Sequence, residues 1–410
     1  MINVLIRVKN VSDVLYPDQN SGIKTPTIFG AVVADALETT GRRLRRLRQM
    51  RKTGSITSAC EALASIWEAG KKPGSIVLRS ALLRADGERL RLTKLVLPRG
   101  IALRFYLLAA FEAQCRLDAD DPWQNVLPLK GPGSWSALVA IDGAYDTASG
   151  TYDTALEDMP ADLRGSTQAE DRWRKMKLED QRLQQVKGAL RTLEDLGQEN
   201  ALVSIDRGAR GQRLYEKFSL MQESGRGENQ TPDFYTVPAP HWAAAKTITL
   251  PEDFFLKGWI QVLNPSEVAT WLILRMMSQW APTKHRTSGV FLTTRPRMQL
   301  FGLRDDAWED GCQRLLEFGL IRHAEPPETE DAGEGVDTDP VMEELFSQPA
   351  RVRQPYEPHF WQMTDGGLSK DAAQKLDQAL ILRQQALDTA AIKRTQQAPG
   401  RPAGGRPADE

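Results

Sequence analysis

Cysteine and histidine are scarce in this sequence, and their scarcity limits the chemistry that the chain could perform. Three cysteines and four histidines occur in 410 residues. Cys60, Cys115 and Cys312 lie far apart, so their spacing indicates neither a disulfide framework nor a set of metal ligands. The histidines are equally isolated from one another. We therefore expect reduced thiols, no metal site and no cofactor.

Long apolar runs and catalytic motifs are missing as well. No apolar run is long enough to span a membrane, and the first residues do not open a signal peptide. Gly131-Pro132-Gly133 lacks the lysine and the strand-to-helix context of a phosphate-binding loop. We expect a cytoplasmic protein with no membrane partner and no enzymatic activity. A carboxylate nuclease is the enzymatic alternative that the sequence leaves open.

What the sequence does contain is an uneven distribution of charge. The formal net charge is −1, yet residues 1–104 hold 19 Lys and Arg against 8 Asp and Glu. Residues 105–222 have a balance of −5, and the remaining residues have one of −7. Such an asymmetry predicts an anionic partner for the N-terminal part of the chain.

The basic N-terminal segment, residues 1–96, contains seven basic residues and no acid between positions 41 and 52. Leu44, Leu47 and Met50 recur at every third position there, which predicts a helix with a narrow apolar seam. The arginines around the rest of this helix suit contact with nucleic-acid phosphates, and they are Arg42, Arg43, Arg45, Arg46 and Arg48. A solvated helix and a membrane-surface helix are the alternatives.

The stretch from Leu250 to His323 predicts one compact unit. Asn264-Pro265-Ser266-Glu267 supplies the cap, the proline and the acid that open a helix. A short strand, a brief helix and a further helix follow, and the inward face of the last is expected to be Trp308, Gly311, Cys312 and Leu315. Strands at 320–322 and 359–363 complete the unit.

This order of helix, strand, helix, helix, strand and strand resembles the winged-helix family of DNA-binding domains. The resemblance lies in element order and spacing, and it implies a winged-helix domain at residues 247–366. The same order is repeated at residues 97–222. The predicted elements of this first copy are helix Ile101–Cys115, strand Asn125–Leu129, helix Ser134–Ile141, a surface-loop insertion at 142–168, helix Glu170–Leu196 and strand Ala201–Ile205. We predict a mainly α fold with small β-sheets (α+β) and two tandem winged-helix domains.

The first copy has the outer face that suits DNA. Opposite its apolar side, the helix predicted at 170–196 presents Arg174, Lys177, Gln181, Gln184, Gln185 and Arg191. Arginine and lysine can reach phosphates or guanine edges, and glutamine can bond adenine in the major groove. A Gly-rich wing at 206–213 holds Arg207, Arg210 and Arg213, which would meet the minor groove or its phosphates. A plain hairpin turn is the alternative for the wing.

The second copy has an acidic outer face instead. The outward residues of its last helix are predicted to be Asp306, Glu309, Asp310, Gln313 and Glu317, and residues 325–350 hold nine acids and no Lys or Arg. Only Arg295, Arg297, Arg304 and the Lys284-His285-Arg286 turn could touch DNA. We interpret this copy as a protein-contact or homodimerisation module.

Four further segments complete the predicted organisation. Before the first copy we expect a helix at Ser55–Ala69 and strands at Ser75–Arg79 and Arg89–Leu97. Residues 223–246 are a predicted linker. Residues 367–394 should form a helix that packs back on the domain or pairs with a partner helix. Residues 395–410 are a predicted disordered tail.

Two hypotheses of function follow. The first is a double-stranded DNA-binding protein that resembles plasmid replication initiators in layout, which implies a role in replication initiation, and a transcriptional regulator fits almost as well. The acidic second copy departs from the basic surface that an initiator should have. The second hypothesis is a non-enzymatic interaction scaffold built on winged-helix domains. The arginine-bearing wing favours the first.

Overall fold

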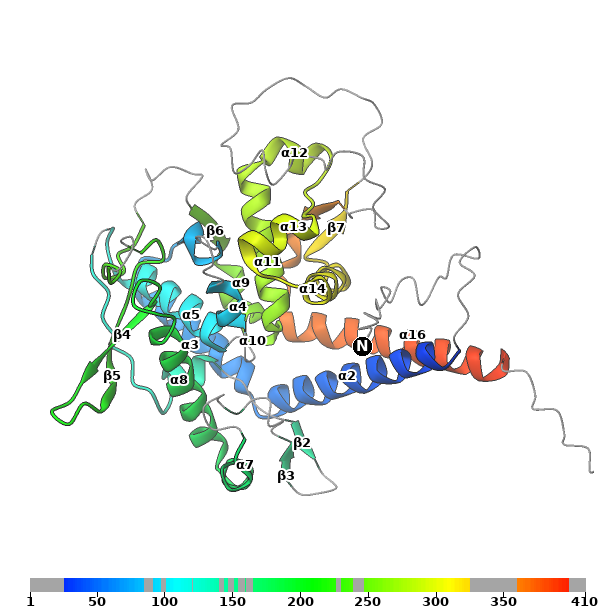
Figure 1. The fold of residues 1–410 in the computed structure, drawn as a ribbon, viewed down its shortest axis with the longest axis horizontal. Helices are drawn as coiled ribbons and strands as arrows, with labels where there is room; N and C mark the ends of the chain where they lie inside the picture. The colour runs from blue at the N-terminus through cyan, green and yellow to red at the C-terminus, as the bar shows by residue number, and fades with distance from the viewer. Residues whose placement is uncertain are drawn as a thin grey trace, which may run out of the picture. The chain divides into compact units, whose positions relative to one another are not determined.

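The computed structural model describes residues 26–84, 91–96, 101–119, 121–139, 144–146, 151–153, 159, 165–225, 230–238, 247–324 and 360–397. Within these residues the chain is mostly helical and has four two-stranded antiparallel sheets (Figure 1). This confirms the predicted class of a mainly α protein with small β-sheets. Contacts divide the chain into two units, one of residues 46–376 and a smaller one of residues 1–45 with 377–410.

Two long helices supply the described part of the smaller unit. They are α2 (Pro26–Lys52) and α16 (Ala372–Gln397), and each continues into the larger unit. Gly41 of α2 lies opposite Gln384 of α16, because a Cβ atom at Gly41 would come 3.9 Å from the Gln384 amide. Each predicted apolar stripe is buried, namely Leu44, Leu47 and Met50 in α2 and Ala373, Leu376, Leu380 and Leu387 in α16. The tail beyond residue 397 lies outside the described residues.

The larger unit begins with α3 (Ser55–Ala69) and β1 (Ser75–Arg79), both as predicted. A 3-10 turn, η1 (Ser80–Leu82), follows. The strand predicted at Arg89–Leu97 is wrong, because residues 91–96 form a helix, α4 (Arg91–Val96). Its buried residues Arg91, Leu92 and Leu95 have the spacing i, i+1, i+4 of a helical face. β1 pairs with a strand far along the chain, β6 (Thr247–Pro251), with Val77 opposite Thr249.

The first predicted winged-helix region is built around α5 (Ile101–Arg116), in which every residue from Ile101 to Cys115 is buried. α6 (Trp135–Val139) follows, but the strand predicted at 125–129 is absent from these described residues. The side chain of Asn125 competes with a strand ladder: it accepts from the Leu127 N–H and the Trp135 indole, and donates to the Leu127 carbonyl. One strand-like bond remains, from the Asn125 N–H to the Phe218 carbonyl at 3.1 Å.

The predicted surface-loop insertion contains a small hairpin, β2 (Ala144–Asp146) with β3 (Thr151–Asp153). The single helix predicted at 170–196 is wrong, because the chain forms two helices, α7 (Thr167–Arg174) and α8 (Leu178–Glu194). Lys177 is extended at the start of α8, and the Gln181 amide donates to the Trp173 carbonyl at 2.8 Å. The same carbonyl also accepts the Met176 N–H at 3.1 Å, so two donors meet it at the end of α7.

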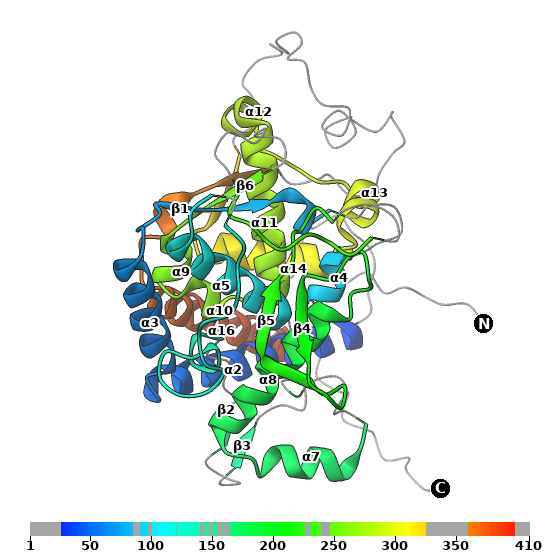
Figure 2. The ribbon, with the colours of Figure 1, turned by 90° about the vertical axis from the view of Figure 1, so that its left-hand side faces the viewer.

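The wing predicted after this helix is a hairpin of β4 (Val203–Arg207) and β5 (Arg213–Leu220). Figure 2 shows the two strands at the front of the molecule with α8 beside them. Its turn closes with a 2.8 Å bond from the Gly208 N–H to the Gln212 carbonyl.

The second predicted winged-helix region follows β6. Its elements are α9 (Asp253–Leu256), α10 (Trp259–Val262), α11 (Pro265–Trp280), α12 (Pro282–Thr287), α13 (Thr294–Pro296), a π-helical turn η5 (Arg297–Phe301), α14 (Asp305–Glu317), β7 (Ile321–His323), β8 (Trp361–Met363) and a 3-10 turn η6 (Asp365–Gly367). The capping box of Asn264 and Glu267 opens α11 as predicted. The four residues predicted to face inward from α14 are buried, and Val290 forms an isolated bridge with Trp361.

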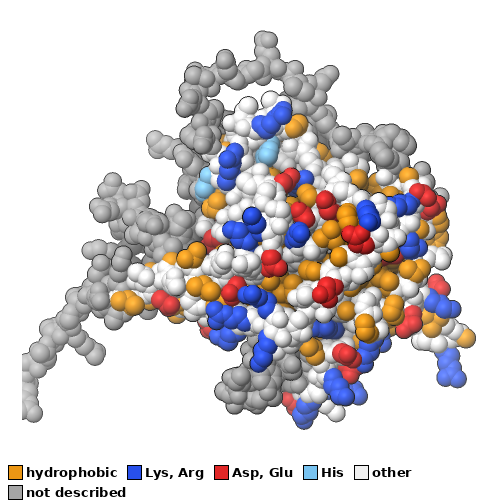
Figure 3. Space-filling model, turned by 180° about the vertical axis from the view of Figure 1, so that it is seen from behind, with side chains coloured by type: hydrophobic (Ala, Val, Ile, Leu, Met, Phe, Trp, Pro, Cys, Tyr) orange, Lys and Arg blue, Asp and Glu red, His pale blue; other side chains and the backbone are white. Residues whose placement is uncertain are grey.

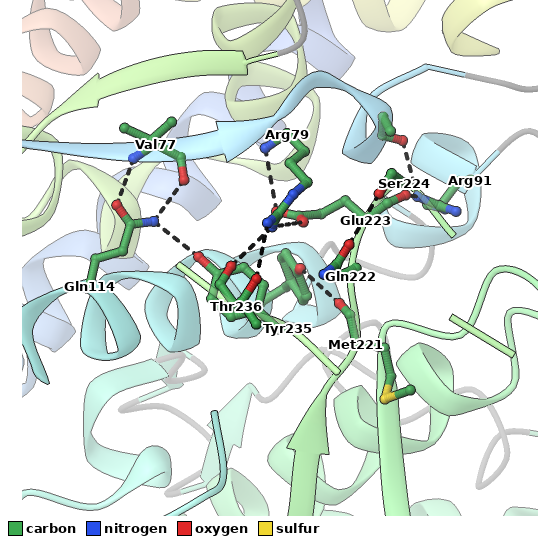
Figure 4. Close-up of polar contacts among 12 residues, drawn as sticks. Val77, Arg79, Arg91, Gln114, Met221, Gln222, Glu223, Ser224, Tyr235 and Thr236 are labelled. Atoms are coloured by element: carbon green, nitrogen blue, oxygen red, sulfur yellow. Dashed lines mark hydrogen bonds and ion pairs between the residues drawn. The ribbon is translucent and has the colours of Figure 1, made fainter. Parts of the chain in front are cut away.

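Part of the predicted linker is instead a buried polar network (Figure 4). Glu223 has no exposed side-chain surface and forms an ion pair with Arg79 at 3.1 Å, and Arg79 is itself 3% exposed. The Arg91 guanidinium donates to the Glu223 carbonyl, and Tyr235 is fully buried with its hydroxyl bonded to Gln114. Hydrogen-bonded partners satisfy groups that would otherwise be costly to bury. Residues 223 and 235 thus belong to the packed interior of the larger unit.

Candidate nucleic-acid interface

The outer face of α8 is set by which of its residues are buried. Val186, Leu190 and Leu193 are buried on its apolar side, and α8 packs against α5 and α6. Gln181 and Gln185 are also inside, with exposed fractions of 2% and 3%. Both had been predicted to read bases from the surface, and this assignment is wrong for a buried amide. Periodicity alone did not indicate the break between α7 and α8, where the Gln181 side chain donates to the Trp173 carbonyl.

A different stripe of α8 faces outward. It consists of Lys177, Gln184, Lys187 and Arg191, which are exposed or half-buried. Lys187 was not among the predicted residues, although it lies three positions after Gln184 and four before Arg191, and this spacing could have identified it. Arg174 ends α7, and its side chain lies outside the described residues. The outward stripe therefore has three cations and one amide, and its two carboxylates are paired: Asp180 with Lys130, and Glu194 with Arg207 and Arg213.

Tyr215 of β5 joins this stripe to the hairpin. The Lys187 ammonium lies 5.5 Å and the Arg191 guanidinium 5.9 Å from the centre of its ring. Arg191 also donates to the Tyr215 hydroxyl at 3.1 Å. An aromatic ring beside two cations orients them by cation–π attraction. Sequence analysis missed Tyr215, although Arg213, Tyr215 and Lys217 alternate along β5 and so share a face.

The three predicted wing arginines have different environments. Arg207 and Arg213 both pair with Glu194 of α8, at 2.8 and 2.6 Å, and Arg213 also pairs with Asp195. Arg210 is exposed at the turn, where its N–H donates to the Gln212 side chain. Among the described residues, no carboxylate forms an ion pair with the Arg210 guanidinium. The turn therefore presents Arg210, and Glu194 engages the other two.

The predicted arginines of α2 lie on a helix, as expected. Arg45 and Arg48 are exposed, whereas Arg42, Arg43 and Arg46 are half-buried. Arg42 forms an ion pair with Glu38 one turn earlier. An exposed pair of this kind contributes little to stability and leaves the cation able to exchange partners.

The outer face of α14 is acidic, as predicted. Asp306 and Asp310 are exposed, and Glu309, Gln313 and Glu317 are half-buried. Arg295 and Arg304 are exposed, but Arg297 is buried and pairs with Asp305, so Arg297 is not a surface residue. The predicted acidic loop at 325–350 lies outside the described residues.

The cysteine thiols lie away from this surface, in α3, α5 and α14. Burial raises the pKa of the Cys60 thiol to about 11 and that of Cys115 to about 12, with nearby acids adding to the effect. No group of three or more His, Cys, Asp or Glu side chains that could hold a metal occurs in the described part of the chain. None of the described helices is long and apolar enough to cross a membrane.

Comparison with known proteins supplies no further constraint, since no protein-family model, curated protein or solved structure matches the chain. The candidate interface is therefore defined by its own geometry, namely the outward stripe of α8, Tyr215 and the turn of the β4–β5 hairpin.

Proposed function

We propose that the chain is a double-stranded DNA-binding protein in which α8 and the β4–β5 hairpin of the first winged-helix domain contact the duplex. The observation that carries this proposal is the placement of Lys187 and Arg191 around Tyr215, beside a hairpin whose turn presents Arg210. Three cations on one helix–hairpin surface suit contact with the phosphates of a duplex.

The proposed contacts are mostly with phosphates. Gln181 and Gln185 are buried, so Gln184 is the remaining glutamine of α8 that could bond a base edge. Phosphate contacts fix position and supply affinity, whereas base contacts supply sequence preference. We therefore expect affinity with a strong dependence on salt and a limited sequence preference. The arginines of α2 are proposed as an additional phosphate contact.

The proposed process is plasmid-type replication initiation or transcriptional regulation, with the second winged-helix domain serving as a protein-contact or homodimerisation module. The acidic outer face of α14 supports this division, because carboxylates at that position would repel a phosphate backbone. The same face supports the alternative function, an interaction scaffold that does not bind DNA specifically.

The test is binding of the full chain to a labelled duplex by fluorescence anisotropy over a range of salt. Lys187→Ala/Arg191→Ala/Arg210→Ala should weaken binding roughly 10-fold or more and reduce the salt slope by about 0.9 for each lost phosphate contact. The matched control removes three exposed lysines elsewhere, Lys71→Ala/Lys257→Ala/Lys370→Ala. Equal losses of affinity in both variants would mean that binding depends only on net charge. That result would contradict the assignment of α8 and the hairpin as the DNA contact.

A second arm of the experiment reverses charge on α14 with Asp306→Lys/Glu309→Lys/Asp310→Lys. If this face lies away from DNA, selection from random duplexes should return the same preference as the unchanged protein. An altered preference would show that α14 faces DNA. Failure of the unchanged protein to bind any duplex would favour the scaffold.

A further inference from the structure

A second cationic surface lies outside the candidate interface, on α12 and the β7–β8 pair. Figure 3 shows Lys and Arg side chains in blue beside histidines in pale blue at the top of the molecule, where α12 lies in Figure 1. None of the residues of α12 is buried. Residues 281–304 contain one lysine, four arginines and no Asp or Glu. This local excess of positive charge is not used by the proposed function.

Gln362 of β8 holds two of these cations in place. Its amide nitrogen donates to the carbonyls of His285 and Arg286, at 3.0 and 3.1 Å, and so binds the C-terminal end of α12. Its amide oxygen accepts from the Arg322 Nε at 3.0 Å. One buried neutral side chain therefore fixes α12 beside β7, and the exposed guanidinium groups of Arg286 and Arg322 belong to one surface.

No carboxylate neutralises these two guanidinium groups within the described residues. Neither Arg286 nor Arg322 forms an ion pair there. Asp365, whose charge acts on His285, pairs with Arg275. His285 adds no charge in this arrangement, because its Nε2 accepts the Met363 N–H at 2.8 Å and must be unprotonated. The free charge of the surface is thus carried by arginine, which binds phosphate with two parallel hydrogen bonds.

Aromatic groups border the arginines. Phe360 is 37% exposed and packs on Phe291 with ring centres 4.8 Å apart, and the Lys284 ammonium lies 5.3 Å from the centre of the Phe291 ring. His323 stacks on Trp361 at 4.5 Å. Basic residues interleaved with exposed ring surface are typical of sites that bind the sugar–phosphate backbone of nucleic acid.

We propose that α12, β7 and β8 form a second surface that binds the phosphodiester backbone of DNA, through Arg286 and Arg322, independently of α8. This inference rests on the proposed DNA-binding function, because both surfaces would act on one duplex. It also assigns the second winged-helix domain a DNA contact on a different face from its acidic α14. A single exposed ring and two arginines fit a phosphate backbone better than the larger apolar core of a protein interface.

The test compares Arg286→Ala/Arg322→Ala with a control pair of exposed cations outside this surface, Lys257→Ala/Lys370→Ala, on the full chain and the duplex used for the α8 variant. The first pair should weaken binding several-fold and lower the salt slope by roughly 2, at about 0.9 for each contact. Arg286→Lys/Arg322→Lys should retain much of the affinity, because the point charge remains. The control pair should bind as the unchanged protein does.

The two proposals fail in different ways. If the α8 variant loses affinity and the Arg286/Arg322 variant does not, the second surface is refuted and the proposed function stands. If the unchanged protein binds no duplex, the proposed function itself is refuted. A polyglutamate peptide serves as the probe for an acidic protein partner, and binding of this peptide that depends on Arg286 and Arg322, without a matching effect on the duplex, would also overturn the second surface. When Arg286→Ala/Arg322→Ala is added to the α8 variant, affinity should fall by about the same factor as it does in the otherwise unchanged protein.

Discussion

The larger unit has two helix–hairpin pairs, α8 with β4–β5 and α14 with β7–β8. Their buried residues follow the same pattern, whereas their exposed residues differ in charge. Leu193 and Leu315 are both fully buried four residues before a glycine, and Gly197 and Gly319 both end their helices with positive φ, 106° and 73°. Only glycine adopts this conformation without cost. The outward residues differ in charge: α8 presents Lys187 and Arg191 beside Tyr215, whereas α14 presents Asp306, Glu309 and Asp310.

This difference shows which parts of a chain specify the fold and which are free to specialise. Burial fixes the inward residues of both helices, since an apolar side chain at the wrong position would lose its contacts. The outward residues carry no such constraint, so one helix–hairpin pair can present cations on its helix while the other presents acids there. Three comparisons between the copies test this view.

The largest expected effect concerns the acid that follows each hairpin. Glu223 lies after β5 and is fully buried with Arg79, whereas Asp365 lies after β8, is 54% exposed and pairs with Arg275. Glu223→Ala would remove the carboxylate that pairs with the buried Arg79 guanidinium and should lower the free energy of unfolding by about 3–5 kcal/mol. Asp365→Ala should cost about 0–1 kcal/mol. Urea denaturation of both variants measures the difference. Equal losses in the free energy of unfolding would show that the Glu223–Arg79 ion pair contributes no more to stability than the exposed pair does.

An intermediate effect is expected at the helix–helix contact eight residues before each glycine. Gly311 of α14 faces Thr270 of α11, and a Cβ atom there would lie 2.9 Å from the Thr270 Cβ. Gly311→Ala should therefore destabilise the protein by about 1–3 kcal/mol through overpacking, although alanine favours helices. The corresponding residue of α8, Ala189, is buried and already has a Cβ atom.

The matched change at the first copy, Ala189→Gly, should cost about 1 kcal/mol through helix propensity. Thermal unfolding of the two single variants and of Gly311→Ala/Thr270→Ala gives the check. Partial recovery in the double variant would identify Thr270 as the source of the strain. A stabilising Gly311→Ala would mean that α11 and α14 are less closely packed than described.

The smallest expected effect is a pH dependence specific to the second copy. Burial, opposed by Asp365 and aided by nearby arginines, lowers the pKa of His285 below its ordinary value of 6.5. The unfolded chain then binds the proton more readily, so this contribution to stability is present above pH 6.5 and is lost as the pH falls below it. Because His285 is half-exposed, the loss should be at most about 1 kcal/mol. The first copy, residues 97–222, contains no histidine.

His285→Gln keeps an acceptor for the Met363 N–H and removes the titration. Melting temperatures measured at pH 7.5 and pH 5.5 should therefore differ less for this variant than for the unchanged protein. If the melting temperature of the variant falls between pH 7.5 and pH 5.5 by as much as that of the unchanged protein, groups other than His285 cause the acid sensitivity.

Sequence periodicity predicted the helices of this fold well, because their buried faces repeat at helical spacing. The inward residues of α14 and the capping box of α11 are examples, and both are confirmed. Short elements were harder: α4 is only six residues long, and its pattern did not distinguish a helix from a strand. At the break between α7 and α8, a side chain donates a hydrogen bond to a main-chain carbonyl, and no periodic pattern encodes such a contact.

The candidate site was predictable only in part. Arg191 and the hairpin arginines were found because basic residues stand out in a sequence. Tyr215 was missed, since its role depends on β5 lying beside α8. The sequence also did not predict that Glu194 bonds both Arg207 and Arg213. These arginines lie 13 and 19 positions after Glu194, on other elements. Such partners are set by tertiary packing, which a single sequence does not reveal.

The pairing of β1 with β6 has a consequence for the order in which the chain can fold during synthesis. Arg79 cannot form its ion pair until Glu223, 144 residues later, has been synthesised. Val77 likewise cannot pair in the sheet until Thr249 is present. When only residues 1–222 have been synthesised, β1 therefore lacks its partner strand and Arg79 lacks its carboxylate. Contacts so distant in sequence close slowly. We expect the larger unit to complete its folding only after β6 has emerged, and a polypeptide cut at residue 222 to resemble this unfinished intermediate rather than an independent domain.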